Sequence, residues 1–191
     1  MSGAAKEDRF AALWRELEAV PEGYFAEIAG GEVRVLPRPG PRHARAASRL
    51  GGALDRLEDD ERGGWVILDE PDVKLGDDVR TPDLAGWRTE RYVEPEHGPY
   101  TIVPDWICEV LSPSTARIDR AEKMPLYARH GVGHLWLIDP VAQTLEVYRR
   151  QHDLWIVVAV PSGGQKVRAE PFESLELDLS RLWHVPGQPP E

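Results

Sequence analysis

Residues 104–113 are Pro104-Asp105-Trp106-Ile107-Cys108-Glu109-Val110-Leu111-Ser112-Pro113, an apolar run that a single carboxylate, Glu109, interrupts. Such a run is typical of a strand that is covered on both faces of a sheet. An ionised carboxylate taken out of water needs a cation, a metal ion or several donors, or it takes up a proton instead. Glu109 is therefore the first candidate for a functional residue.

A second acidic strand begins 26 positions earlier, in Pro82-Asp83-Leu84-Ala85-Gly86-Trp87. Alternation places Glu109 on one face of its strand together with Asp105, Ile107 and Leu111. Inward carboxylates on neighbouring strands repel each other unless a divalent cation lies between them. Carboxylate oxygens favour magnesium or manganese over zinc, so Asp83 and Glu109 are predicted metal ligands.

Composition indicates one soluble domain. The length of 191 residues predicts a single domain over 1–191 with loose termini at 1–9 and 185–191, and 41% hydrophobic content is ordinary for a globular protein. The single cysteine, Cys108, falls in the apolar strand, which excludes a disulfide framework and indicates a reducing cytoplasm. No signal peptide and no membrane span is predicted.

Charge gives two opposing indications about nucleic acid. The net charge of −10 disfavours general binding to phosphates. However, Val33 to Leu54 contains no Asp or Glu but five arginines, which are Arg34, Arg38, Arg42, Arg45 and Arg49. This basic stripe could guide a polyanion to one face, or it could be an ordinary solvated helix face.

Periodicity predicts an α/β chain of the mixed α+β type, with a mixed central sheet flanked by helices and an N-terminal β-hairpin. Pro125 conflicts with an unbroken helix, so a kink or a later start is expected there. Asp119 with Glu122 matches a capping box. The predicted helices span 7–20, 42–60 and 119–130, and the predicted strands span 24–28, 32–36, 65–68, 73–75, 84–87, 105–111, 134–138, 144–149 and 155–160.

Lys123 is the third candidate functional residue. The simpler interpretation is a solvated partner of Asp119, four positions earlier on the same helix. Lysine is rare in this chain, which has 4 Lys against 19 Arg, and Lys123 closely follows the Glu109 strand. An ammonium group beside a metal-held water can orient the nucleophile or stabilise a phosphate that is under attack.

These motifs together resemble the Uma-type restriction endonucleases of bacteria, within the PD-(D/E)XK nuclease superfamily. The resemblance covers roughly Tyr24 to Val160, and the combination is specific although each piece alone is weak. The matching motifs are Gly31-Glu32, Pro39-x-Pro41-x-His43, Pro82-Asp83-Leu84, Asp105-x-x-x-Glu109-Val110-Leu111-Ser112-Pro113-Ser114-Thr115, Asp119-x-x-x-Lys123, Tyr127-Ala128, Gly131-Val132 and Trp136-Leu137-Ile138-Asp139-Pro140.

The resemblance implies a restriction-endonuclease-like core in which Asp83 and Glu109 bind the metal and Lys123 is the catalytic lysine. The usual lysine position of the superfamily, two residues after the glutamate, is occupied by Leu111. His43 and Glu32 match the family pattern, but a helix start and a hairpin explain them adequately, so neither is assigned as catalytic. Asp105 could be an outer ligand or the first residue of a strand, and the latter is slightly favoured.

The implied function is a Mg²⁺-dependent (or Mn²⁺-dependent) endonuclease that hydrolyses phosphodiester bonds in DNA. A homodimer would suit cleavage of both strands of a duplex. The alternative is a lapsed protein of the same fold that binds nucleic acid or a protein partner without cutting, which the net charge favours. A glycosidase with paired carboxylates explains neither the lysine nor the basic stripe.

Overall fold

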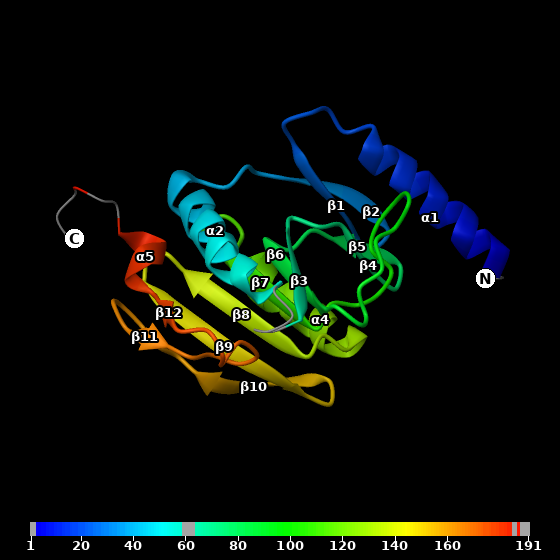
Figure 1. The fold of residues 1–191 in the computed structure, drawn as a ribbon. Coiled ribbons are helices and arrows are strands. Elements are labelled where there is room, and N and C mark those ends of the chain that lie inside the picture. Colours follow the sequence, from blue (N-terminus) through cyan, green and yellow to red (C-terminus); the bar gives the residue numbers. More distant parts are fainter. Residues whose placement is uncertain (1–2, 59–63, 185–186, 188–191) are drawn as a thin grey trace.

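The computed structural model describes residues 3–58, 64–184 and 187. Within these residues the strands form a six-stranded sheet, a four-stranded sheet and a small two-stranded one (Figure 1). Helices pack on both faces of the six-stranded sheet, as the sequence predicted for a mixed α+β chain. No helix in the described ranges is long and apolar enough to cross a membrane.

The six-stranded sheet carries the Glu109 strand near its centre, in the order β10-β9-β8-β7-β6-β3. Of the neighbouring pairs in this sheet, β7 and β8 run parallel and the others run antiparallel. Parallel neighbours need a crossover, and the chain between them is helical. The strands are β3 (Trp65–Asp69), β6 (Leu84–Arg88), β7 (Trp106–Val110), β8 (His134–Asp139), β9 (Thr144–Gln151) and β10 (Leu154–Ala159).

The four-stranded sheet contains the predicted N-terminal hairpin. Gly30 and Gly31 form its two-residue turn with φ of +64° and +83°, a conformation that glycine adopts without strain. One strand, β5 (Asp78–Arg80), was not predicted, because two of its three residues are charged and no apolar pattern marks it. The sheet order is β2-β1-β5-β4, with β1 (Phe25–Ala29), β2 (Glu32–Leu36) and β4 (Val73–Leu75).

Two apolar cores lie on opposite faces of β7. Trp106, Cys108 and Val110 pack with helices α2 (Pro41–Leu54) and α5 (Ser180–Trp183). Ile107 and Leu111 pack with α4 (Met124–His130) on the other face. The alternation predicted for this strand is confirmed, and it turns the Glu109 side chain toward the crossover helix.

Several helix bounds differ from the sequence-based expectation. Helix α1 (Gly3–Glu18) begins at Gly3, so residues 3–9 are helical and the expectation of a loose segment there was wrong. Helix α2 is followed by a 3₁₀ turn, η1 (Asp55–Leu57), and the predicted end near residue 60 lies outside the described residues, as does the C-terminal tail apart from Gly187. The two-stranded sheet pairs β11 (Lys166–Val167) with β12 (Leu177–Asp178).

The crossover helix accommodates Pro125 through a wide turn. It runs from α3 (Ala116–Ile118) through a π-helical segment, η2 (Asp119–Lys123), into α4. The Met124 N–H donates to the carbonyl of Asp119, five residues earlier. Proline lacks an N–H and its ring displaces the preceding turn, which explains the widening. Asp119 lies inside the helix and is buried, so the predicted capping box was wrong.

Candidate active site

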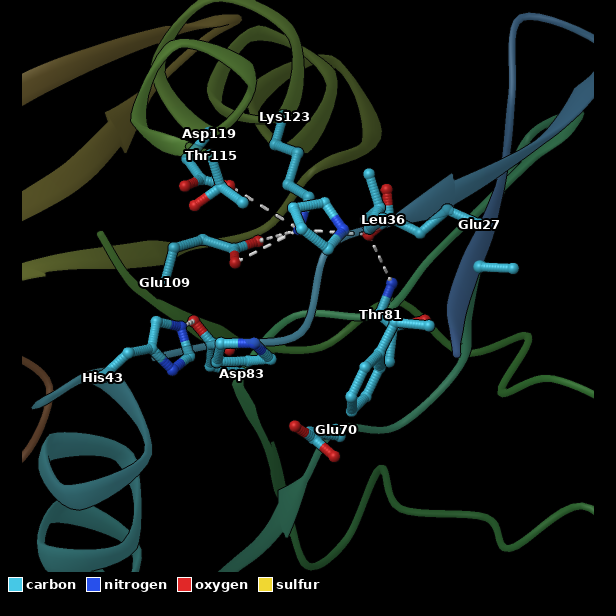
Figure 2. Close-up of a pocket in the computed structure, with 14 residues that line it drawn as sticks. Glu27, Leu36, His43, Glu70, Thr81, Asp83, Glu109, Thr115, Asp119 and Lys123 are labelled. Atoms are coloured by element: carbon cyan, nitrogen blue, oxygen red, sulfur yellow. Dashed lines mark hydrogen bonds and ion pairs between the residues drawn. The ribbon is translucent and has the colours of Figure 1, made fainter. Parts of the chain in front are cut away.

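Asp83, Glu109 and Lys123 meet at one pocket of about 60 Å³ between the two sheets and the crossover helix (Figure 2). In the β6–β7 pairing Leu84 lies opposite Cys108, so one further step places Asp83 opposite Glu109. The lining residues are Phe25, Ala26, Glu27, Leu36, Pro37, Pro39, His43, Glu70, Thr81, Asp83, Glu109, Thr115, Asp119 and Lys123.

Glu109 is 2% exposed, yet donors surround its carboxylate. The Tyr127 hydroxyl donates to Oε1 at 2.5 Å, and the Lys123 ammonium lies 3.2 Å from Oε1 and 3.3 Å from Oε2. Burial raises the pKa of Glu109 well above its ordinary value, and the charge of Lys123 works against that rise. Lys123 is therefore the main group that favours the ionised form of Glu109.

Lys123 is buried at 5% exposure, which excludes the interpretation as a solvated helix residue. Its Nζ lies 3.0 Å from Glu27 Oε1 and 3.7 Å from Asp119 Oδ1, in addition to its contacts with Glu109. Burial lowers the pKa of Lys123, but the surrounding carboxylates outweigh burial and the net shift is upward. The side chain is thus a fixed cation in the pocket.

Glu27 is a site residue that sequence reasoning missed. It lies in the middle of β1 at 1% exposure and accepts from Lys123, from the Arg80 guanidinium at 3.1 Å and from the Thr81 N–H at 3.1 Å. The sequence does contain a signal for Glu27, because Phe25-Ala26-Glu27-Ile28-Ala29 is an apolar segment with one central carboxylate. The same argument that selected Glu109 selects Glu27.

Asp83 and His43 form a second linked pair. Asp83 Oδ2 accepts from the Val110 N–H at 2.6 Å and lies 3.1 Å from His43 Nε2. His43 is in the first turn of α2 and is 8% exposed, and its other ring nitrogen, Nδ1, is buried with no hydrogen-bond partner among the described residues. His43, left without an assigned role by the sequence, is therefore part of the site.

Two further residues of the family pattern lie away from the pocket. Glu32 is exposed at the hairpin turn. Asp105 accepts from the Arg88 N–H at 2.9 Å and from the Arg91 side chain, so its carboxylate is engaged at the start of β7. Neither residue lines the pocket.

The pocket carries more carboxylates than cations. Beyond Asp83 and Glu109, its wall includes Glu27, Glu70 and Asp119, against Lys123. Burial, followed by the Asp83 charge, raises the pKa of Glu70, and burial also raises the pKa of Asp119, to about 6. This excess of hard oxygen ligands matches the preference of Mg²⁺ or Mn²⁺.

No three His, Cys, Asp or Glu side chains in the described part of the chain are grouped closely enough to hold a metal ion by themselves. A site with fewer protein ligands is what magnesium chemistry calls for, since Mg²⁺ keeps several waters and binds through one or two carboxylates plus a substrate phosphate. Asp83 and Glu109 supply two carboxylates, and the residues present therefore fit such an ion.

Comparisons with known proteins bear on the family and the fold of this chain. A model of the Uma2 family, described as "Putative restriction endonuclease", matches residues 14–180. The crystal structure of "a putative nuclease belonging to DUF820" from Anabaena variabilis is similar, with a TM-score of 0.72 and 26% identity over 90% of this chain and 97% of that chain. No curated protein matched. Because the family model spans most of the sequence, the chain belongs to the Uma2 family and has its restriction-endonuclease-like nuclease fold.

Proposed function

We propose that this protein is a metal-dependent endonuclease that hydrolyses phosphodiester bonds in DNA. The observation that carries the proposal is the pocket itself, in which two carboxylates from paired strands adjoin a buried lysine. Nuclease chemistry needs a cation-binding carboxylate pair and a positive group near the phosphate, and we assign these roles to Asp83 with Glu109 and to Lys123.

Asp83 and Glu109 are the proposed metal ligands. A bound Mg²⁺ or Mn²⁺ would lower the pKa of an attached water and neutralise charge on the phosphate. The Val110 N–H and His43 fix the Asp83 carboxylate, and Tyr127 and Lys123 fix that of Glu109. Both carboxylates are held in place before any ligand arrives, as a preorganised site requires.

Lys123 is the proposed cationic group that stabilises negative charge on the attacked phosphate. Glu27 is the proposed positioning residue, because its Oε1 lies 3.0 Å from the ammonium while Arg80 and Thr81 hold the Glu27 carboxylate in turn. At about 60 Å³ the pocket has room for roughly two waters, so the phosphate would approach at its mouth.

We further propose one domain spanning the chain, since residues from β1 through α4 line a single pocket. A homodimer is proposed because cutting both strands of a duplex at one position calls for two copies of the site.

A lapsed relative that binds nucleic acid or a protein without cutting is the second candidate function. The net charge of −10 favours it, and so do the contacts that already occupy both oxygens of Glu109. The two candidates differ in one measurable property, which is phosphodiester cleavage.

The deciding experiment is a cleavage assay with supercoiled DNA, linear duplex, single-stranded DNA and RNA, titrated with Mg²⁺ and Mn²⁺. Cleavage of DNA that depends on the metal, and that falls to background in Asp83→Asn and Glu109→Gln, is expected. Lys123→Ala should reduce the rate by about 100-fold, the scale of losing one preorganised electrostatic group, and Lys123→Arg should recover little of it. An inactive parent would favour the lapsed relative, whereas cleavage that Asp83→Asn leaves unaffected would refute the assignment of Asp83 as a metal ligand.

A further inference from the structure

A second pocket, of about 210 Å³, lies between α2 and α5, away from the carboxylate site. Three arginines line it: Arg49 on α2, Arg56 just beyond α2 in η1, and Arg181 on α5. The pocket volume is several times the roughly 30 Å³ that one water occupies in the liquid, so a polyatomic anion has room there.

The three guanidinium groups make no hydrogen bond or ion pair with any described residue, and all three side chains are exposed. The pocket wall also contains Glu176 and Asp178. Glu176 is paired with Lys166 at 3.7 Å, and Asp178 accepts from the Ser180 hydroxyl at 2.6 Å. The lining of this pocket therefore carries three arginines against two carboxylates, each of which already has another partner.

Three other arginines of the basic stripe are engaged elsewhere in the structure. Arg34 pairs with Glu122 at 3.0 Å, while Arg38 and Arg45 donate to the backbone carbonyls of Gly23 and His184. The arginines of the predicted stripe therefore do not form one continuous surface, and Arg49 is the member of the stripe that lines the α2–α5 pocket. Arg56 and Arg181 join Arg49 there only through the fold.

We propose that the α2–α5 pocket binds a phosphate group of the nucleic-acid backbone, at a distance from the bond that is cut. Arginine suits this ligand because its planar group donates two parallel hydrogen bonds to phosphate oxygens. This inference rests on the proposed function for the identity of the polyanion, but the binding itself needs neither metal nor cleavage.

The position of the pocket relative to the carboxylate site is set by α2. His43, in the first turn of α2, contacts Asp83, and Arg49 follows six residues later on the same helix. At about 1.5 Å per residue, Arg49 is about 9 Å along the helix from His43, and Arg56 is farther along the chain. A phosphate in the pocket would thus be about three or more nucleotides from the cut bond, at roughly 3.4 Å per nucleotide.

The test measures DNA affinity by fluorescence anisotropy in EDTA, with a labelled 24-base-pair duplex at several salt concentrations. Arg49→Ala, Arg56→Ala and Arg181→Ala are compared with Arg129→Ala, which removes an exposed arginine from α4 on the opposite face of the sheet. Each pocket variant should lower the magnitude of the salt slope by nearly 1 and weaken binding about eight-fold at 0.1 M salt. Arg129→Ala should leave both unchanged.

A second arm titrates inorganic phosphate alone and follows the Tm. If phosphate raises the Tm of the parent but not of Arg49→Ala, while the duplex affinities of the two are equal, the pocket takes a free phosphate and the nucleic-acid assignment is overturned. Pocket variants that bind the duplex like Arg129→Ala also overturn it, whether or not the parent cuts DNA. If the parent never cuts DNA but the pocket variants bind the duplex more weakly than the parent does, this inference is supported and the proposed cleavage is refuted.

Discussion

Replacing Lys123 by Met should destabilise the protein by about 3–5 kcal/mol at pH 8, the usual cost of removing one partner from a buried ion pair. Methionine preserves most of the side-chain volume but removes the charge. Glu27, Glu109 and Asp119 lie 3.0, 3.2 and 3.7 Å from the ammonium and would lose their common cation. The exposed-pair interpretation of Lys123 would have predicted almost no cost, and its burial overturns that expectation.

The cost should depend on pH in a defined direction. Burial raises the pKa of Glu109, and of Asp119 to about 6, while Lys123 opposes both shifts. Without Lys123 the pKa values of Glu109 and Asp119 in the folded state rise further above their values in the unfolded chain. The folded variant therefore holds protons that the unfolded chain has released. Its stability is then greatest at low pH and falls as pH increases through the folded pKa values, by about 1.4 kcal/mol per unit for each proton.

Urea unfolding followed by tryptophan fluorescence, in EDTA at pH 5.5, 6.5 and 8, measures this. The difference between parent and Lys123→Met should grow by at least about 1.4 kcal/mol from pH 5.5 to pH 8. Lys6→Met is the matched control, because Lys6 pairs with Asp77 at 3.3 Å with both side chains more than half exposed, and it should cost at most about 1 kcal/mol. If Lys123→Met and Lys6→Met lower the free energy of unfolding by the same amount, or if the effect of Lys123→Met is independent of pH, Lys123 is not the buried cation described above.

Three further changes test other parts of the structure. Glu27→Gln should slow single-turnover DNA cleavage by up to about 100-fold through misplacement of Lys123, with duplex affinity in EDTA unchanged; an unaltered rate would exclude the positioning role. Tyr127→Phe removes a donor that lowers the pKa of Glu109, so the acidic limb of the pH–rate profile should move to higher pH, and an unmoved limb would contradict this. Gly86→Ala should destabilise by about 1–3 kcal/mol in urea unfolding, because the added Cβ would meet Ile67 Cδ1 at 2.8 Å and the Trp106 ring at 3.2 Å; a neutral change would show that both side chains can move aside.

The sequence predicted those features that neighbouring residues control. Alternation within 105–111 assigned Glu109 to the same face as Ile107 and Leu111, and the two cores on either side of β7 confirm that assignment. Pro125 predicted an irregular helix, because proline lacks an N–H and disturbs the turn around it regardless of which other elements pack against the helix. The hairpin over β1 and β2 followed from two short strand-like segments that flank two glycines.

What the sequence by itself determined was therefore the local chemistry, namely two strands with carboxylates and a nearby lysine. The tertiary structure decided which groups share the pocket: it placed Glu27 beside Lys123, His43 beside Asp83, and Arg181 beside the pocket residues Arg49 and Arg56. The physical reason is that periodicity reports only which face of its own strand or helix a side chain occupies. Contacts between segments far apart in the chain, and the burial that turns Lys123 from a solvated charge into a fixed cation, arise only when the two sheets and the crossover helix pack together.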